Sequence, residues 1–323
     1  MFKIASLFSG AGGLDLGFKQ AGFEISWAND IFIEAAETYK KNIGDHITTN
    51  NIEDINSSEI PDVDGIIGGF PCQGFSMANS KRTTEDVRNK LYLQFVRVLK
   101  EKKPLFFVAE NVKGILSLGK GEVFKQILAD FSEAGYNVRH QLFNAADFGV
   151  PQSRQRVFLF GLRKDIDRNY SSFPPMPTHA SPDKAIDLGL SPWISIGKAL
   201  EDIPEPDMDH DLENHSASQY KLRFNGFLGH RTINPDLPSP TITARGDERG
   251  GVVIHHHPKN HRRLTAREAA LIQSFPRDFA FVGAKTSAYR QIANAVPPLL
   301  ARSIAISVRD TIETSLRRNN EKN

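Results

Sequence analysis

The chain has 323 residues, of which 40% are hydrophobic and 24% charged, with 24 Gly and 18 Pro. This is the composition of one or two ordinary globular domains, and it argues against disorder, collagen and coiled coils. No apolar run approaches the roughly 18 residues that a membrane span needs, and the first residues lead into a strand pattern, so we expect a soluble, intracellular protein. The single cysteine, Cys72, excludes internal disulfides and zinc clusters built from cysteines.

The formal net charge of +2 hides an asymmetry along the chain. Residues 1–66 hold four lysines against eleven acidic residues, a balance of −7, whereas residues 221–267 hold nine basic residues against three acidic ones, a balance of +6. The basic stretch is either a solvated face or a surface that binds a polyanion.

In the first half of the chain, short apolar runs alternate with amphipathic segments, a pattern typical of a doubly wound α/β domain. We expect strands at residues 4–8, 23–28, 63–68, 105–109 and 157–161, and helices at residues 14–21, 33–42, 91–100 and 122–134.

The pattern changes near residue 162, where we place a domain boundary. Residues 171–240 are rich in proline and lose their periodicity, which indicates a loop-rich module with short strands. Helical spacing returns at residues 265–274 and 289–308, interrupted by Pro297-Pro298, and we expect the charged tail to fray.

The first strand is followed by Phe8-Ser9-Gly10-Ala11-Gly12-Gly13. Glycines here permit a tight turn and the close approach of a ligand to the backbone. Asp30 ends the second strand, where a carboxylate can accept from both ribose hydroxyls of an adenosine. A plain βα turn beside a solvated aspartate has the same pattern, and a dinucleotide such as NAD fits nearly as well. Because the loop departs from G-x-G-x-x-G, we favour a smaller nucleoside cofactor.

Cys72 lies just past the expected strand at residues 63–68, where open α/β sheets place their reactive groups. A lone intracellular cysteine is more often an inert buried residue. The glycines and the proline around it predict a rigid loop, which suits a nucleophile better than a core position.

The strand at residues 105–109 runs into Glu110-Asn111-Val112. A carboxyl group beside the Cys72 strand would be partly desolvated, which raises its pKa and lets it donate a proton near neutral pH. Asn111 by itself is also a good helix N-cap.

A second polar motif, Gln152-Ser153-Arg154-Gln155-Arg156, precedes the late strand. Strand alternation places Gln152, Arg154 and Arg156 on one side. Two arginines on one face either hold anionic or carbonyl oxygens by paired hydrogen bonds or form a surface salt-bridge face.

In this order the motifs resemble those of the C5-cytosine DNA methyltransferase family, over almost the whole chain. The matching segments are Phe8 to Gly13 (the S-adenosylmethionine loop), Phe70-Pro71-Cys72-Gln73 (the nucleophile loop), Glu110-Asn111-Val112, Gln152 to Arg156, Asn294-Ala295-Val296-Pro297, and residues 263–276, which look like the scaffold of the recognition domain. Three positions depart from the family pattern, namely Ile31, Asn51 and Ala293.

The resemblance implies an α/β fold: a Rossmann-like S-adenosylmethionine-dependent domain of residues 1–161 plus 283–323, and a smaller, loop-rich target-recognition domain of residues 162–282. It implies catalytic roles for Cys72, Glu110, Arg154 and Arg156. The implied cofactor contacts are Phe8, Gly10, Gly12, Gly13, Asp30, Asn51, Ile52, Pro71, Leu91 and Asn294. No metal is expected.

The reaction implied is transfer of a methyl group from S-adenosylmethionine to C5 of a flipped-out cytosine, with Cys72 bonded to C6 and Glu110 donating to N3. Arg154 and Arg156 would help hold the base and the catalytic loop, one of them reaching the cytosine O2. Residues 73–88, with Lys81 and Arg82, would close over the base. The expected contacts to double-stranded DNA are Arg223, His230, Arg231, Thr241, Thr243, Arg245 and Arg249. We expect His255-His256-His257 and His261 to form a flexible, phosphate-facing loop rather than a metal site.

The same resemblance implies a monomer in the bacterial cytoplasm, associated with the nucleoid through DNA. A cognate restriction endonuclease would act on the same site without a stable complex. Three alternatives stay open: a tRNA-cytosine methyltransferase, a DNA-binding protein that has lost catalysis, and a cysteine hydrolase. The intact Cys72, Glu110 and Arg154 argue against the second, and the lack of a paired histidine motif near Cys72 argues against the third.

Overall fold

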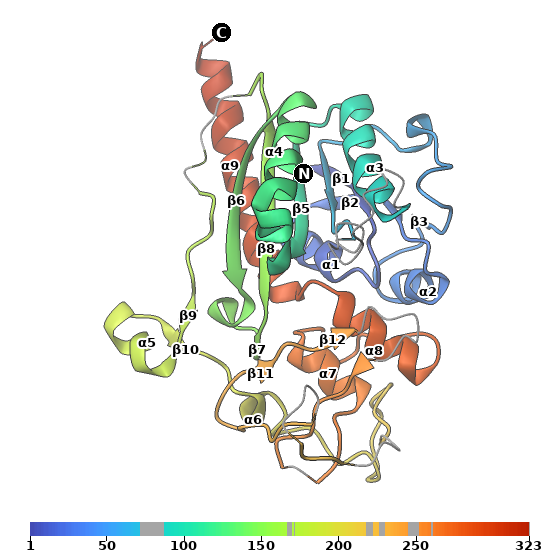
Figure 1. Cartoon of the computed structure of the whole chain (residues 1–323), viewed down its shortest axis with the longest axis vertical. Helices are drawn as coiled ribbons and strands as arrows, with labels where there is room; N and C mark the ends of the chain where they lie inside the picture. The colour runs from blue at the N-terminus through green and yellow to red at the C-terminus, as the bar shows by residue number, and fades with distance from the viewer. Residues whose placement is uncertain are drawn as a thin grey trace.

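The structure, a computed structural model, describes residues 1–71, 87–166, 170, 172–217, 222–225, 230–244, 252–259 and 261–322. Within these residues a seven-stranded sheet in the order β3-β2-β1-β4-β5-β8-β6 forms the larger part of the molecule (Figure 1). Its strands are β1 (Lys3–Leu7), β2 (Glu24–Asn29), β3 (Ile47–Thr48), β4 (Gly65–Gly68), β5 (Phe106–Val112), β6 (Tyr136–Asn144) and β8 (Gln155–Arg163). The first five run parallel, and β8 lies antiparallel between β5 and β6.

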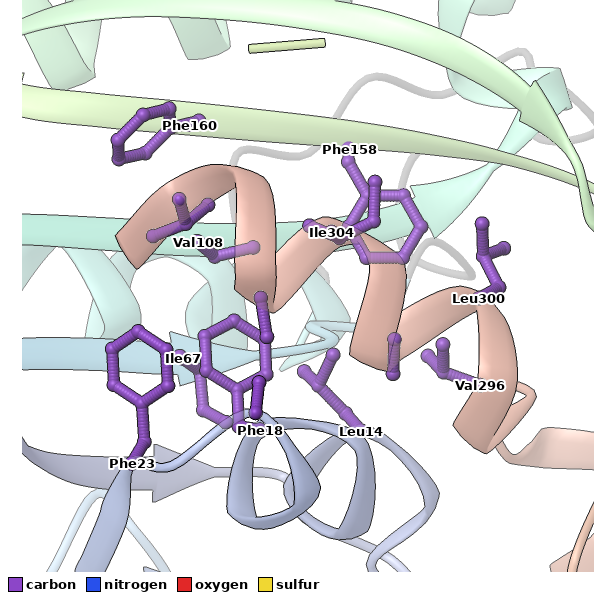
Figure 2. Packing of buried hydrophobic residues seen from close by; sticks show 14 of the residues in the cluster. Leu14, Phe18, Phe23, Ile67, Val108, Phe158, Phe160, Val296, Leu300 and Ile304 are labelled. Atoms are coloured by element: carbon purple, nitrogen blue, oxygen red, sulfur yellow. The ribbon is translucent and has the colours of Figure 1, made fainter. Parts of the chain in front are cut away.

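Helices cover both faces of this sheet. The covering helices are α1 (Gly13–Gln20), α3 (Val87–Lys102), α4 (Glu122–Glu133) and α9 (Pro298–Lys322). Strand alternation divides the core, so that Val108 of β5 packs with α1 and α9 while its neighbour Phe107 packs with α3 and α4. Figure 2 shows Phe18 of α1 and Ile304 of α9 in the first of these clusters. The two-sided burial explains why the central strands read as continuous apolar runs.

A smaller, loop-rich part lies below the sheet in Figure 1. Its elements are β9 (His179–Ala180), α5 (Pro182–Leu188), β10 (Ser191–Pro192), α6 (Ile196–Ala199), β11 (Ser239–Pro240), β12 (Thr243–Ala244), β13 (Val252–Val253), α7 (Ala266–Ile272) and α8 (Lys285–Asn294). It joins the sheet through α2 (Ile33–Asn42), whose Ala36 and Tyr39 share a core with Ile242 and Ile292, and through β7 (Gln152–Ser153), which pairs with β11.

Short 3-10 turns complete the described elements: η1 (Ser57–Glu59), η3 (Lys113–Leu116), η4 (Leu118–Gly121) and η5 (Ala145–Phe148). None of the helices in the described ranges is long and apolar enough to span a bilayer.

The α/β class is confirmed, and α2 has the expected bounds. Two strands of the sheet, β3 and β6, were not predicted from the sequence pattern. In β6 the exposed Arg139, His140 and Gln141 interrupt the alternation, as edge strands allow. The expected frayed tail is wrong, because α9 continues to Lys322 and buries Ile312 and Ser315 against the sheet.

The division into residues 1–161 plus 283–323 and residues 162–282 stays a prediction. As expected, α9 returns to the sheet and packs on α1. Tyr170 and Phe173, however, lie beyond residue 161 and still belong to the core on the α1 and α9 face. The core of the sheet therefore includes residues beyond the expected boundary at residue 161.

The contact between α1 and α9 depends on Gly17, where an added Cβ would fall 2.4 Å from Ala301 Cβ and 2.6 Å from the Arg302 nitrogen. We predict that Gly17→Ala lowers the free energy of unfolding by about 1–3 kcal/mol, because overpacking outweighs the better helix propensity of alanine. Chemical denaturation measures this. Gly114→Ala is the matched control, since a Cβ there meets nothing within 4 Å. Equal stability of both variants would contradict the packing argument.

Candidate active site

A cavity of about 630 Å³ opens at the carboxyl ends of β1, β2, β4 and β5. The chain leaves β1 for β2 on one side and later places β4 on the other side, and open α/β sheets form a crevice where the order reverses in this way. The described lining residues are Ser6, Phe8, Ser9, Gly10, Ala11, Gly13, Leu14, Asp15, Asn29, Asp30, Ile31, Phe32, Ala35, Asn51, Ile52, Gly68, Gly69, Phe70, Pro71, Leu91, Glu110, Asn111, Val112, Gln291, Asn294, Ala295 and Val296.

The cavity collects nearly all of the expected cofactor contacts from segments far apart in the sequence. Those that line it are Phe8, Gly10, Gly13, Asp30, Asn51, Ile52, Pro71, Leu91 and Asn294. Gly12 does not. Its φ of 86° favours glycine, and an added Cβ would fall 2.1 Å from Ile43 Cδ1. Gly12 therefore serves the packing of the loop on α2.

Asp30 fixes the shape of the glycine loop. Its Oδ2 accepts from the Gly10 N–H at 2.7 Å, and its Oδ1 accepts from the Phe32 N–H at 2.8 Å. Burial raises the pKa of this carboxyl group, and the two backbone hydrogen bonds oppose that rise. The carboxylate thus connects the turn after β1 with the turn after β2, and each oxygen keeps a second lone pair toward the cavity.

Asp15 is a lining residue that the sequence analysis missed. It is fully buried in the first turn of α1, and it accepts from Ser6 Oγ at 3.0 Å and from the Tyr39 hydroxyl at 2.9 Å. Burial raises its pKa to about 6. An acidic residue one turn after a glycine loop looks like an ordinary partner of the helix dipole, so its burial gives no sequence signal.

Glu110 lies at the opposite wall and is also buried. Arg156 Nε donates to its Oε1 at 2.8 Å. Burial raises the pKa of Glu110, and the positive charges of Arg156 and Arg154 oppose this. Gly69 leaves room for the carboxylate, since a Cβ there would fall 3.0 Å from Glu110 Oε2.

Asn111 is not a helix cap. Its Nδ2 donates to the backbone oxygen of Phe70 at 3.0 Å, and it is buried. It therefore fixes the main chain just before Pro71-Cys72. Cys72 itself lies outside the described residues, as do Lys81 and Arg82. Asn111 had no sequence signal for this role, because its partner is distant in the chain.

The two arginines of the second polar motif have different partners. Arg156 pairs with Glu110, whereas the fully buried guanidinium of Arg154 donates to the backbone oxygens of Ile242, Ala293 and Ala295, at 2.9, 2.8 and 3.0 Å. The expectation that the two arginines help hold the base and the catalytic loop, with one of them reaching the base, stays a prediction. Neither side chain lines the cavity.

In the smaller part, the expectation of a flexible, phosphate-facing histidine loop is wrong for His255, His256 and His257, which are buried. Burial lowers the pKa of all three, so they are neutral at pH 7. Arg262 in the same region pairs with Glu205 and Glu268. Among the described residues, no group of three or more histidine, aspartate, glutamate or cysteine side chains is placed to hold a metal.

The expected DNA contacts have mixed positions. Arg231 is exposed, His230 accepts from Arg263 Nη2 at 3.2 Å, and Thr241 Oγ1 donates to the Ser153 oxygen at 2.7 Å. Arg245 and Arg249 lie outside the described residues.

The comparisons with known proteins agree with one another. Residues 2–309 match the family described as C-5 cytosine-specific DNA methylase. The chain is 42% identical over 338 residues to the Type II methyltransferase M.NgoFVII of Neisseria gonorrhoeae, covering 96% of this chain and 88% of that protein. It is 40% identical over 332 residues to M.FnuDI of Fusobacterium nucleatum, covering 96% and 95%.

Solved structures show the same architecture. A prophage-encoded protein from E. coli matches with a TM-score of 0.77 and 26% identity, over 97% of this chain and 100% of that one. The S. pombe Dnmt2 methyltransferase matches with a TM-score of 0.70 and 20% identity, over 97% and 99%. The second likeness concerns the fold alone.

Asp15 makes stability depend on pH. The folded protein keeps this proton up to about pH 6, whereas the ordinary value is 3.8, so between these values the folded state binds more protons than the unfolded chain. We predict that the contribution of Asp15 to the free energy of unfolding falls by about 3 kcal/mol as the pH rises through that window. Denaturation of the wild type and Asp15→Asn at pH 4 and pH 7 measures it. The variant should gain relative stability at pH 7, and parallel pH profiles would contradict a buried titrating Asp15.

Proposed function

The chain belongs to the C-5 cytosine-specific DNA methylase family and is a DNA (cytosine-5-)-methyltransferase, and from this premise we propose that it methylates C5 of a cytosine flipped out of duplex DNA, through a covalent bond to Cys72. Its curated relatives are Type II methyltransferases, the modification class of restriction-modification systems. The observation that carries the proposal is Glu110, a buried carboxyl group at the wall of the cavity, one residue before the asparagine that holds the main chain at Phe70.

The charge of the cavity supports S-adenosylmethionine as the cofactor. Its described titratable lining residues are the carboxylic acids Asp15, Asp30 and Glu110. Such walls favour a cation and disfavour the pyrophosphate of NAD, the alternative left open by the glycine loop. Asp30 and Asn51 offer hydrogen-bonding groups for a ribose and an adenine, and Ile52 and Leu91 offer apolar contacts. When bound, S-adenosylmethionine supplies the methyl group as a sulfonium electrophile.

The residues of this chain make cytosine C5 nucleophilic. The Cys72 thiolate forms a bond to C6, and Glu110 donates a proton to N3, which leaves an enamine with electron density at C5. After C5 has taken the methyl group, loss of the C5 proton to a base restores the C5–C6 double bond and expels the thiolate, and N3 returns its proton to Glu110. The raised pKa of Glu110 lets it carry the proton that N3 needs.

Arg156 holds Glu110 in place by its ion pair, and we assign it to the base side of the site. Since C6 and N3 are unreachable inside a duplex, the cytosine must leave the stack, at a cost of a few kcal/mol that protein contacts offset. The smaller part, with the exposed Arg231, is the proposed contact to DNA. The match to a DNA methylase family favours DNA over the tRNA alternative.

We predict that Glu110→Gln lowers kcat by about 10²- to 10⁴-fold while the Kd for DNA changes only a few-fold, because its proton acts mainly in the transition state. Methyl transfer from labelled cofactor to duplex DNA, with a gel-shift assay alongside, measures both. The matched control is Glu133→Gln, an exposed partner of Lys100 that should behave as wild type. A Glu110→Gln variant with unchanged kcat would remove Glu110 from the mechanism.

The covalent step has its own test, a duplex carrying 5-fluorocytosine at the target position. Fluorine cannot leave as a cation, so elimination is blocked after methyl transfer. The protein should remain attached to DNA in denaturing electrophoresis, only with S-adenosylmethionine present and not in Cys72→Ser. The duplex is chosen by bisulfite sequencing of DNA from cells that express the chain, with tRNA as a parallel substrate. If no adduct forms on a duplex that is methylated when cytosine is present, covalent catalysis by Cys72 is wrong.

A further inference from the structure

Arg154 lies where three segments distant in sequence meet. Its Nη1 donates to the backbone oxygen of Ile242, and its Nη2 donates to those of Ala293 and Ala295. The side chain is fully buried, and its remaining nitrogen, Nε, has no hydrogen-bond partner. A guanidinium enclosed in this way holds main chain and has no free donor that reaches the cavity.

Two glutamines brace the same junction. Gln152 Oε1 accepts from the Ile242 N–H at 3.1 Å, so that Gln152 and Arg154 together take both polar groups of the Ile242 peptide backbone. Gln273 Nε2 donates to the Ala295 oxygen at 2.6 Å, and Gln152 Nε2 donates to Gln273 Oε1 at 2.5 Å. The junction has two ends, the Ile242 backbone and the Ala295 oxygen. Each end has two side-chain partners, which makes a shift of one end relative to the other costly.

The two ends lie beside residues that are expected to contact different ligands. Ile242 lies between Thr241 and Thr243, which belong to the proposed DNA contacts. At the other end, Asn294, Ala295 and Val296 line the cofactor cavity. The glycine loop rests against this end, since a Cβ at Gly13 would fall 2.3 Å from the Val296 oxygen. A displacement of residues 293–296 is therefore transmitted to the loop that contacts the cofactor.

We propose that Arg154 is a positioning residue that couples DNA binding to cofactor binding, by joining the backbone of Ile242 to that of residues 293–295. The inference rests on the proposed function, because it needs both ligands. Coupling between two sites is reciprocal, so DNA and cofactor strengthen each other's binding by the same factor. Without the guanidinium, the buried oxygens of Ile242 and Ala293 lose this donor, and the two segments stay linked only through the Gln152–Gln273 pair, which weakens the coupling.

The test is a binding cycle on the full chain. The probes are S-adenosylhomocysteine, which permits no turnover, and a duplex whose methylation by the wild type has been mapped by bisulfite sequencing. Calorimetry gives the Kd of S-adenosylhomocysteine with and without the duplex, and a gel-shift assay gives the Kd of the duplex with and without S-adenosylhomocysteine. For the wild type we expect both ratios to be about tenfold, within the usual range of coupling between sites.

In Arg154→Gln both ratios should fall below about twofold, and Arg154→Lys should restore part of the coupling. The matched control is Arg156→Gln, which should lose kcat and keep the wild-type ratios, because Arg156 contacts Glu110 and not the junction. Should Arg154→Gln fail to fold, Gln273→Met removes one of the two holds on Ala295 and should lower the ratios partly.

Three results would overturn the coupling. One is a folded Arg154→Gln variant with wild-type ratios and a low kcat, which would return Arg154 to a base-holding role. If Arg154→Gln does not fold, wild-type ratios in Gln273→Met would overturn the coupling as well. The last is a wild type that methylates DNA but binds each ligand with the same Kd whether or not the other ligand is present. That result leaves the proposed function standing. A chain that transfers no methyl group to DNA overturns both.

Discussion

The buried ion pair between Glu110 and Arg156 depends on one reversed strand. Because β8 runs antiparallel to β5, its first residues lie at the cavity end of the sheet, where Arg156 pairs in register with Val112 beside Glu110. A parallel strand in this place would bring its last residues there instead. The reversed strand thus provides a positive charge next to a cavity whose described titratable lining residues are all carboxylic acids, and it keeps the buried Glu110 from being isolated.

The three acids that line the cavity differ in their hydrogen-bond and ion-pair partners. Asp30 accepts two backbone hydrogen bonds, Asp15 accepts two hydroxyl hydrogen bonds, and Glu110 has an arginine. Burial raises the pKa of each, but the opposing interactions differ in kind. Asp30 connects two turns, Asp15 is buried in the first turn of α1, and Glu110 is the proposed proton donor to the substrate. Environment rather than residue type separates these tasks.

The sequence predicted the central strands well, because Phe106 to Ala109 is apolar on both faces and burial on both faces leaves that signal. It also located Glu110, since the residue directly follows this run. It failed where a side chain acts on distant backbone: Asn111 holds Phe70, and Arg154 holds Ile242, and no local pattern encodes such pairs. His255 to His257 were misjudged because histidine is polar in composition, whereas in the structure all three are buried.

The position of α9 has a consequence during protein synthesis. The face of the sheet that carries Val108 and Phe158 is completed by Leu300 and Ile304, which are translated after all seven strands of this sheet. A nascent chain that extends past β8 but not yet to α9 would show this apolar face to water, and exposed surface of that kind promotes aggregation and proteolysis. The catalytic sheet therefore matures after the smaller part has been translated. Chains cut short before α9 should therefore be cleared rather than accumulate.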